Sequence, residues 1–270
     1  MRLRSLVVRT FLYLLSLESH VYAFAIAANV LLSFFPFLVL VLSLAQNLLH
    51  LPAAAETIYA AVRELLPEDP GLVDFVTRNL RAAVESRGRA EALSALMLVF
   101  SSNGVFMPLE VALNRLWGFA DDRSYWANQA LSLLLTFVCG LLAFGTAVVA
   151  ARGAGSMLVT RFVTVALTIA IAAIVYVVLP NGRVARWRTL RVSLYVGLAL
   201  ELGRDLYLLI WPHLGFRRIY GPFFISITLL VGGYLAAMIV LAGGFVAARG
   251  LQEPPRPEPH QDGRKVGSSS

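Results

Sequence analysis

The chain has 270 residues, of which 58% are hydrophobic and only 14% are charged, and its formal net charge is +7. A soluble domain carries about a quarter charged residues, so this composition excludes an ordinary soluble protein and indicates an integral membrane protein. The positive charge is almost entirely arginine, scattered over loop ends rather than gathered on an aromatic-rich stripe. This pattern argues against nucleic-acid binding and favours membrane lipids with anionic headgroups as partners.

The first thirty residues begin basic and turn apolar, as a signal peptide does. Glu18 and His20 interrupt this segment, and a longer apolar run follows. We therefore expect a basic interfacial helix that leads into the first membrane span. Cys139 is the only cysteine, so neither an intrachain disulfide nor a cysteine metal site is expected, and no motif implies a cofactor.

Six apolar stretches are each long enough to cross the hydrocarbon core as a helix, which is the structure that satisfies its own backbone hydrogen bonds there. The sequence thus predicts an all-α, polytopic membrane protein with one transmembrane domain over 1–248. The segment 249–270 is rich in proline and polar residues, which predicts a disordered cytoplasmic tail. The predicted spans are 21–46, 92–113, 128–150, 157–179, 190–211 and 221–248.

The long connection between the first two spans contains "LVDFVTRNLRAAVESR", in which charged and apolar residues alternate with helical period. Asp74, Arg78, Arg81 and Glu85 share one face, which predicts an amphipathic helix. A second helix is expected near 58–66, before the breaker "LPEDP". Two interpretations of this pair are open: a solvated cap over the bundle, or a lid or partner-binding site.

Arginines in short loops set the expected orientation. The loop "NGRVARWRTLR" between spans four and five and the N-terminus are arginine-rich, whereas the loops after spans three and five hold fewer. The positive-inside rule then places both termini in the cytoplasm, in agreement with an even number of spans. The amphipathic pair accordingly faces outward.

Polar residues and prolines lie within spans one and two. Span one contains Asn29, Ser33 and Pro36. Because proline removes a backbone hydrogen bond and clashes with the carbonyl one turn earlier, the second span is expected to kink near its glycine. This segment either packs closely through small residues or forms a broken helix that lines a cavity. Its residues are Ser101, Ser102, Asn103, Gly104 and Pro108.

The fifth span carries three charged residues, Glu201, Arg204 and Asp205, close to the predicted bilayer midplane. At 100° per residue they occupy an arc of roughly 100°, so we expect all three to face the bundle interior or a wet cavity. Arg204 can neutralise one carboxylate, so a second cation or a bound proton is implied. The trio is either a salt-bridged staple or part of a polar substrate or proton pathway.

Several stretches together resemble the YihY/virulence factor BrkB family of bacterial inner-membrane proteins, once labelled as ribonuclease BN. The similar segments are "LLSFFPFLVLVLSL", "SSNGVFMPLEVALNRLWGFADDRSYW", "LELGRDLY" and "YGPFFISITLLVGGYLAA". The resemblance implies six transmembrane helices and a bacterial inner-membrane location, but no settled activity. It also marks a motif after the second span, comprising Glu110, Asn114, Arg115, Arg123 and Trp126.

The chain departs from the family pattern in two places. Ala28 and Asn29 stand where the family tends to carry aromatic residues. Span six has Gly243, Gly244 and Phe245 where a carboxylate is common, so a role built on that carboxylate is not expected here. These glycines, with Gly232 and Gly233, favour close helix packing.

Four classes of function follow from these features. Mid-membrane charges, proline-interrupted helices and an outward cap favour a transporter or flippase for a lipid or other amphiphile. A non-catalytic envelope scaffold that binds envelope proteins through the amphipathic pair is the main alternative, and conduction of ions or small solutes is a third. An enzyme is not expected, because the four histidines are dispersed and no nucleophile or metal-ligand motif is present.

Overall fold

The structure is a computed structural model that describes residues 2–48, 52–65, 70–85, 88–119, 123–152, 157–182, 184, 186–210, 213, 215 and 219–249. In these residues it contains helices and no strand. The predicted tail beyond Arg249 lies outside the described residues. The helices are α1 (Arg2–Leu14), α2 (Leu17–Ser43), the π-helix η1 (Leu44–Leu48), α3 (Pro52–Leu65), α4 (Pro70–Glu85), α5 (Arg89–Trp117), α6 (Tyr125–Arg152), α7 (Met157–Val178), α8 (Arg186–Ile210), the short 3₁₀ helix η3 (Gly221–Phe223) and α10 (Phe224–Arg249).

Among the described residues, five helices are long and apolar enough to cross a membrane. They correspond to five of the six predicted spans. The fifth predicted span, 190–211, became α8, which is helical over 25 residues but is not one of these five. Its charged residues lower its hydropathy below that of its neighbours. The five segments are Leu17–Gln46, Ala92–Trp117, Tyr125–Ala143, Leu158–Val178 and Ser226–Ala248.

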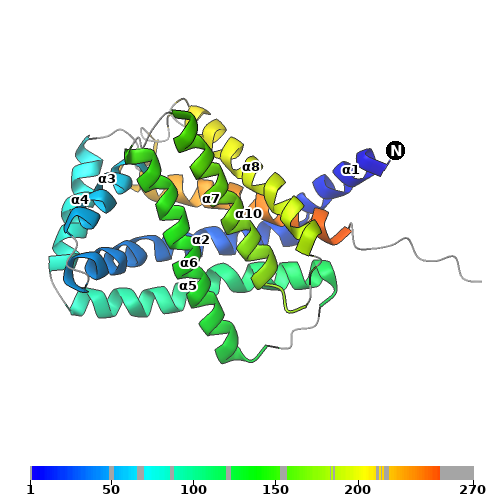
Figure 1. Cartoon of the computed structure of the whole chain (residues 1–270), viewed down its shortest axis with the longest axis horizontal. Helices are drawn as coiled ribbons and strands as arrows, with labels where there is room; N and C mark the ends of the chain where they lie inside the picture. The colour runs from blue at the N-terminus through cyan, green and yellow to red at the C-terminus, as the bar shows by residue number, and fades with distance from the viewer. Residues whose placement is uncertain are drawn as a thin grey trace, which may run out of the picture.

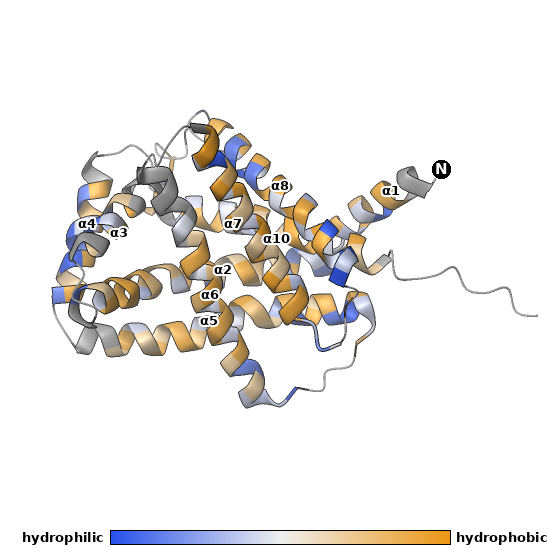
Figure 2. Cartoon of the chain, in the orientation of Figure 1, coloured by the Kyte–Doolittle hydropathy of each residue, from blue (hydrophilic) through white to orange (hydrophobic). Residues whose placement is uncertain are grey.

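Helix α2 is the centre of the bundle, and it packs along α5 on one side and α10 on another. In Figure 1, α2 and α5 run side by side along the long axis, whereas α6 and α7 cross that direction steeply. Helix α8 packs between α7 and α10. Figure 2 shows mainly hydrophobic residues along α2 and α5, whereas α4 and α8 carry hydrophilic residues among hydrophobic ones. This arrangement is that of a membrane bundle, because lipid-facing surfaces are also apolar.

Helices α3 and α4 lie at one end of the long axis, and α1 projects from the other (Figure 1). The buried faces of α3 and α4 share one apolar cluster with α2 and the start of α5. At the edge of this cluster, Arg81 of α4 forms an ion pair with Glu56 of α3 at 3.4 Å and lies over the Tyr59 ring. The cluster includes Leu38, Leu42, Tyr59, Val62, Val76, Leu80, Val84 and Leu98.

The predicted interfacial helix at the N-terminus is α1. Its apolar residues Val8, Phe11 and Leu12 are exposed, while Tyr13 stacks on Phe245 of α10 with 4.8 Å between ring centroids. Ser16 then caps α2 by accepting a hydrogen bond from the Ser19 backbone N–H, and the chain turns into the first span. An apolar helix face without protein cover at a bundle end is typical of a helix that lies in the membrane interface.

Of the two interpretations of the second span, close helix packing fits the structure, because the helix is not broken. Helix α2 continues through Pro36, and α5 continues through Gly104 and Pro108 without interruption. The two helices pack along each other, and this packing holds both segments in helical conformation. A transmembrane helix tolerates proline in this way because neighbouring helices and polar side chains compensate the freed carbonyl.

Candidate functional site

Four charged side chains form one cluster at the contact between α7 and α8. Glu201 is the buried member: its Oε1 accepts a 2.6 Å hydrogen bond from the Thr168 hydroxyl, and its Oε2 lies 2.9 Å from Arg204. Arg161 of α7 lies 3.6 Å from Glu201 and also pairs with Asp205. Arg204 reaches Asp205 as well, at 3.6 Å. Two guanidinium groups thus balance two carboxylates, and the cluster has no net charge.

The cluster is only partly enclosed. The Glu201 side chain is 7% exposed, whereas those of Arg161, Arg204 and Asp205 are 44%, 40% and 42% exposed. All three were expected to face the bundle interior or a wet cavity; Glu201 is buried in the interior, whereas Arg204 and Asp205 are partly exposed. Glu201 lies in the middle of the arc and packs against α7, and Arg204 and Asp205 lie at the two edges of the arc.

Thr168 gives the depth of the cluster, because it is the middle residue of the candidate span Leu158–Val178. Its hydrogen bond holds the Glu201 carboxylate at the same level. Arg161 lies near one end of that span, and its long side chain reaches along α7 to the carboxylates. The charges therefore extend from the middle of this candidate span toward one of its ends, as the long arginine side chain permits.

Arg161 and Thr168 were missed as site residues by sequence reasoning, which counted Arg161 only as a loop charge. Arg161, Thr164 and Thr168 are spaced i, i+3 and i+7, so they share one face of α7. Arg161 is the second cation that the two carboxylates of α8 require. That spacing could have indicated a polar face on α7, but not which helix it meets.

The polar residues of the first two spans lie at a different helix contact, between α2 and α5. Asn29 donates a 2.8 Å hydrogen bond to the Ala25 carbonyl, and its side chain lies against the backbone of Gly104. Ser101 is buried and donates to the Met97 carbonyl at 2.8 Å. The side chains of Ser102 and Asn103 are outside the described residues. The residues proposed for one pathway are thus divided between two helix contacts.

Replacing Gly104 with Ala is expected to lower stability by about 1 to 3 kcal/mol, the usual cost of overpacking. The new Cβ would collide with the Asn29 amide and displace it from the Ala25 carbonyl. Thermal unfolding of the detergent-purified protein measures the effect. A second change, Asn29→Ala, removes the colliding group and should restore most of the lost stability. If the single variant unfolds like the wild type, the α2–α5 contact is looser than described.

The motif residues after the second span join the ends of α5 and α7. Arg123 donates to three carbonyls at the end of α7, those of Val178, Leu179 and Pro180, at 3.0 to 3.1 Å. These carbonyls have no partner within the helix, and a cation is favoured there by the helix dipole. Arg123 also lies 3.8 Å from the buried carboxylate of Glu110.

Two further motif residues hold the same end of the bundle. Asn114 is buried, and its Oδ1 accepts a 2.9 Å hydrogen bond from the Asn181 backbone N–H. Arg115 forms a 2.5 Å ion pair with Glu18 at the start of α2. Gly118 ends α5 with a φ of +71°, a left-handed conformation that turns the chain back toward Arg123. These contacts connect the end of α5 to the start of α2 and to the segment after α7.

Trp126, the last motif residue, is 78% exposed at the start of α6. Its neighbour Tyr125 and Trp187 at the start of α8 are exposed as well, and Arg191 lies 5.7 Å from the Trp187 ring. The starts of α6 and α8 lie at the same end of the bundle. Arg123 shows this, because it precedes α6 and donates to the carbonyls at the end of α7, the helix that comes before α8 in the chain. Exposed tryptophan and tyrosine are typical of the membrane–water interface, so this end of the bundle is one boundary of the hydrocarbon region.

Comparison with known proteins identifies one family. The model of the family described as virulence factor BrkB matches residues 15–265, which is nearly the whole chain. No curated protein and no solved structure matches the chain significantly.

Proposed function

The chain belongs to the virulence factor BrkB family, and on that premise we propose that this membrane protein is a transporter or flippase for a lipid or another amphiphile. The observation that carries the proposal is the ion cluster of Arg161, Glu201, Arg204 and Asp205. It lies beside the middle of the candidate span Leu158–Val178, it is neutral overall, and three of its members are partly exposed.

The composition of the cluster fits a lipid headgroup. Arginine binds phosphate with two parallel hydrogen bonds, and a carboxylate binds an amine. A headgroup could enter the cluster from the side while its acyl chains stayed in the lipid. Its phosphate would then bind the arginines and its amine the carboxylates, in place of the ion pairs that these side chains form with each other. The cost of bringing a charged headgroup to mid-membrane would fall, since the charges would be paired throughout.

We further propose that α8 is the sixth crossing of a bacterial inner membrane. It has 25 residues, about 37 Å of helix, and it packs between two candidate spans. Six crossings would place both termini on the same side. The exposed arginines at the start of α8, Arg186, Arg188 and Arg191, support the cytoplasm as that side. Helices α3 and α4 would then form an outward-facing amphipathic cap.

A scaffold function is the second candidate, and one observation favours it. Phe75 of α4 is 59% exposed on the face opposite the apolar cluster, where a partner could cover it. Under this proposal the cap binds envelope proteins and the ion cluster is a staple. The two candidate functions make different predictions: transport requires the charges of the ion cluster, whereas binding of envelope proteins by the cap does not.

Transport is tested with the full-length protein in vesicles that contain a phospholipid with a fluorescent headgroup label. The double substitution Glu201→Gln and Asp205→Asn should slow lipid movement by about tenfold or more, which corresponds to about 1.4 kcal/mol at the barrier. Glu56→Gln is the matched control, since Glu56 belongs to an exposed ion pair outside the spans. Size-exclusion chromatography verifies folding, and Glu201→Gln alone serves if the double variant is unstable. Unchanged movement in a folded variant contradicts the proposal.

A further inference from the structure

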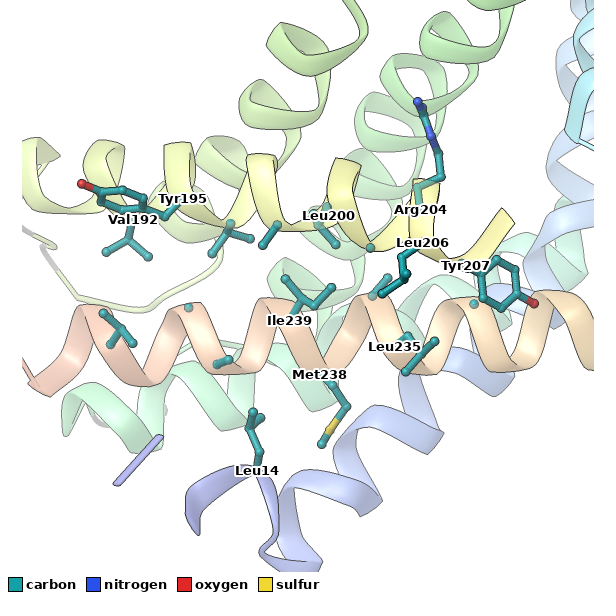
Figure 3. A pocket seen from close by; sticks show the side chains of 18 of the residues that line it. Leu14, Val192, Tyr195, Leu200, Arg204, Leu206, Tyr207, Leu235, Met238 and Ile239 are labelled. Carbon is teal, nitrogen blue, oxygen red and sulfur yellow. The ribbon is translucent and has the colours of Figure 1, made fainter. Parts of the chain in front are cut away.

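An apolar groove runs between α8 and α10, and Arg204 of the ion cluster is one of the residues that line it. Its volume is about 770 Å³, and apolar side chains make up almost all of its lining. Figure 3 shows the two helices side by side with the groove between them, Leu14 of α1 near it, and the Arg204 side chain pointing away from α10. The groove and the ion cluster therefore share Arg204, but Glu201, Asp205 and Arg161 do not line the groove.

Small residues leave the groove unfilled. Ala199 and Gly203 of α8, together with Gly232, Ala236 and Ala242 of α10, lie along it. A Cβ placed on Gly232 would have nothing nearer than the Tyr207 ring, at 3.8 Å. By contrast, a Cβ on the adjacent Gly233 would contact the Ala27 backbone of α2 at 3.4 Å. Gly233 therefore serves helix packing, whereas Gly232 leaves room for something else.

The groove opens to the surroundings of the bundle. Tyr195 and Leu206 of α8 and Leu235 of α10 line it, and all three are exposed. Between Val192 and Ile210 the groove follows 18 residue steps, about 27 Å of helix. The hydrocarbon of one leaflet is about half of a ~30 Å core, so the groove is long enough for an acyl chain.

One end of the groove carries a cation. Arg188, Val192, Tyr195 and Ala199 are spaced i, i+4, i+7 and i+11, so they share one face of α8. Arg188 is exposed and stands one turn before the first groove residue, near the aromatic end of the bundle. The apolar groove suits an acyl chain, and the arginine at its interfacial end suits an anionic headgroup.

We propose that the α8–α10 groove binds one acyl chain of an anionic phospholipid, with the headgroup phosphate at Arg188. The site goes beyond the proposed function, because occupancy of the groove requires no lipid movement. Small residues in both helices hold the chain between them, and the exposed walls let it enter sideways from the leaflet. The acyl chain would also fill the space between α8 and α10. It would thereby stabilise α8, the least apolar of the six proposed membrane spans.

Photolabelling in vesicles tests the proposal. Phosphatidylglycerol with a photoreactive group on its acyl chain should label α8 and α10 peptides, including Leu235, Met238 and Ile239, several-fold more than exposed apolar residues of α6. Arg188→Gln should weaken labelling by about fivefold, since one arginine near an anionic surface contributes about 1 kcal/mol. Arg186→Gln is the matched control, because Arg186 is also exposed but lies on a different face of α8. Phosphatidylcholine with the same chain should label less.

Ala236→Leu fills the groove and should reduce labelling, whereas Ala166→Leu on the exposed surface of α7 should not. Equal labelling of all lipid-facing helices would overturn the proposal, as would cross-links showing that a second copy of the chain covers the groove. The labelling of the wild-type protein needs no variant to fold. Because the readout is binding, a failure here is distinguishable from a failure of the transport assay with the ion-cluster variant.

Discussion

Replacing Arg161 with Met is expected to abolish lipid movement and to destabilise the folded protein by about 2.5 to 3.5 kcal/mol, the cost of an unbalanced charge at mid-span. Arg161 contacts both carboxylates of α8, and without it Glu201 and Asp205 share Arg204 alone. One negative charge is then left without a counterion at membrane depth. Thermal unfolding in detergent measures the stability, and the vesicle assay measures the movement.

A second substitution makes this prediction specific to charge balance. Asp205→Asn in the Arg161→Met background leaves Glu201 with Arg204, so the cluster is neutral again. The double variant should regain much of the stability lost by Arg161→Met, with a coupling of about 1 to 3 kcal/mol. Arg81→Met is the matched control: its ion pair with Glu56 is exposed and outside the spans, and such pairs contribute about 1 kcal/mol or less. An Arg161→Met variant that is no less stable than this control would refute the charge-balance argument.

Replacing Arg123 with Ala should lower the stability by about 2 to 4 kcal/mol, because hydrogen bonds from a charged donor contribute more than neutral ones. Three carbonyls at the end of α7 lose their donor at once, and Glu110 loses a cation at 3.8 Å. Arg123→Lys should recover only part of the loss, since an ammonium lacks the planar fork that reaches several acceptors.

The control for this prediction is Arg78→Ala. Arg78 also donates to a backbone carbonyl, that of Asp74, but it makes this contact on the exposed face of α4. Its loss should cost well under the Arg123 value. Unfolding temperatures of the three variants in the same detergent decide the order, and equal temperatures for the Arg123 and Arg78 variants would contradict the role of Arg123 in fastening α7.

The sequence was sufficient to predict a helical membrane protein, because hydropathy and helical period are local properties of a segment. It was also sufficient to group Glu201, Arg204 and Asp205, since residues spaced i, i+3 and i+4 lie on one side of a helix whatever surrounds it. Local reasoning left open whether the second span is broken or packs closely, and packing between α2 and α5 keeps both proline-containing helices continuous. It also left open whether the trio faces the interior or a wet cavity, and the structure leaves Arg204 and Asp205 partly exposed.

Only the tertiary structure decided which helices meet and which of their faces touch. Arg161 and Glu201 are 40 positions apart, and the period of α7 indicates a polar face without indicating its partner. The same holds for Arg123, which caps a helix more than 50 positions away, and for the groove, which depends on the separation of α8 from α10. Such contacts depend on how each helix is rotated and tilted against its neighbours. That choice is made by side-chain packing across the whole bundle, which no single segment encodes.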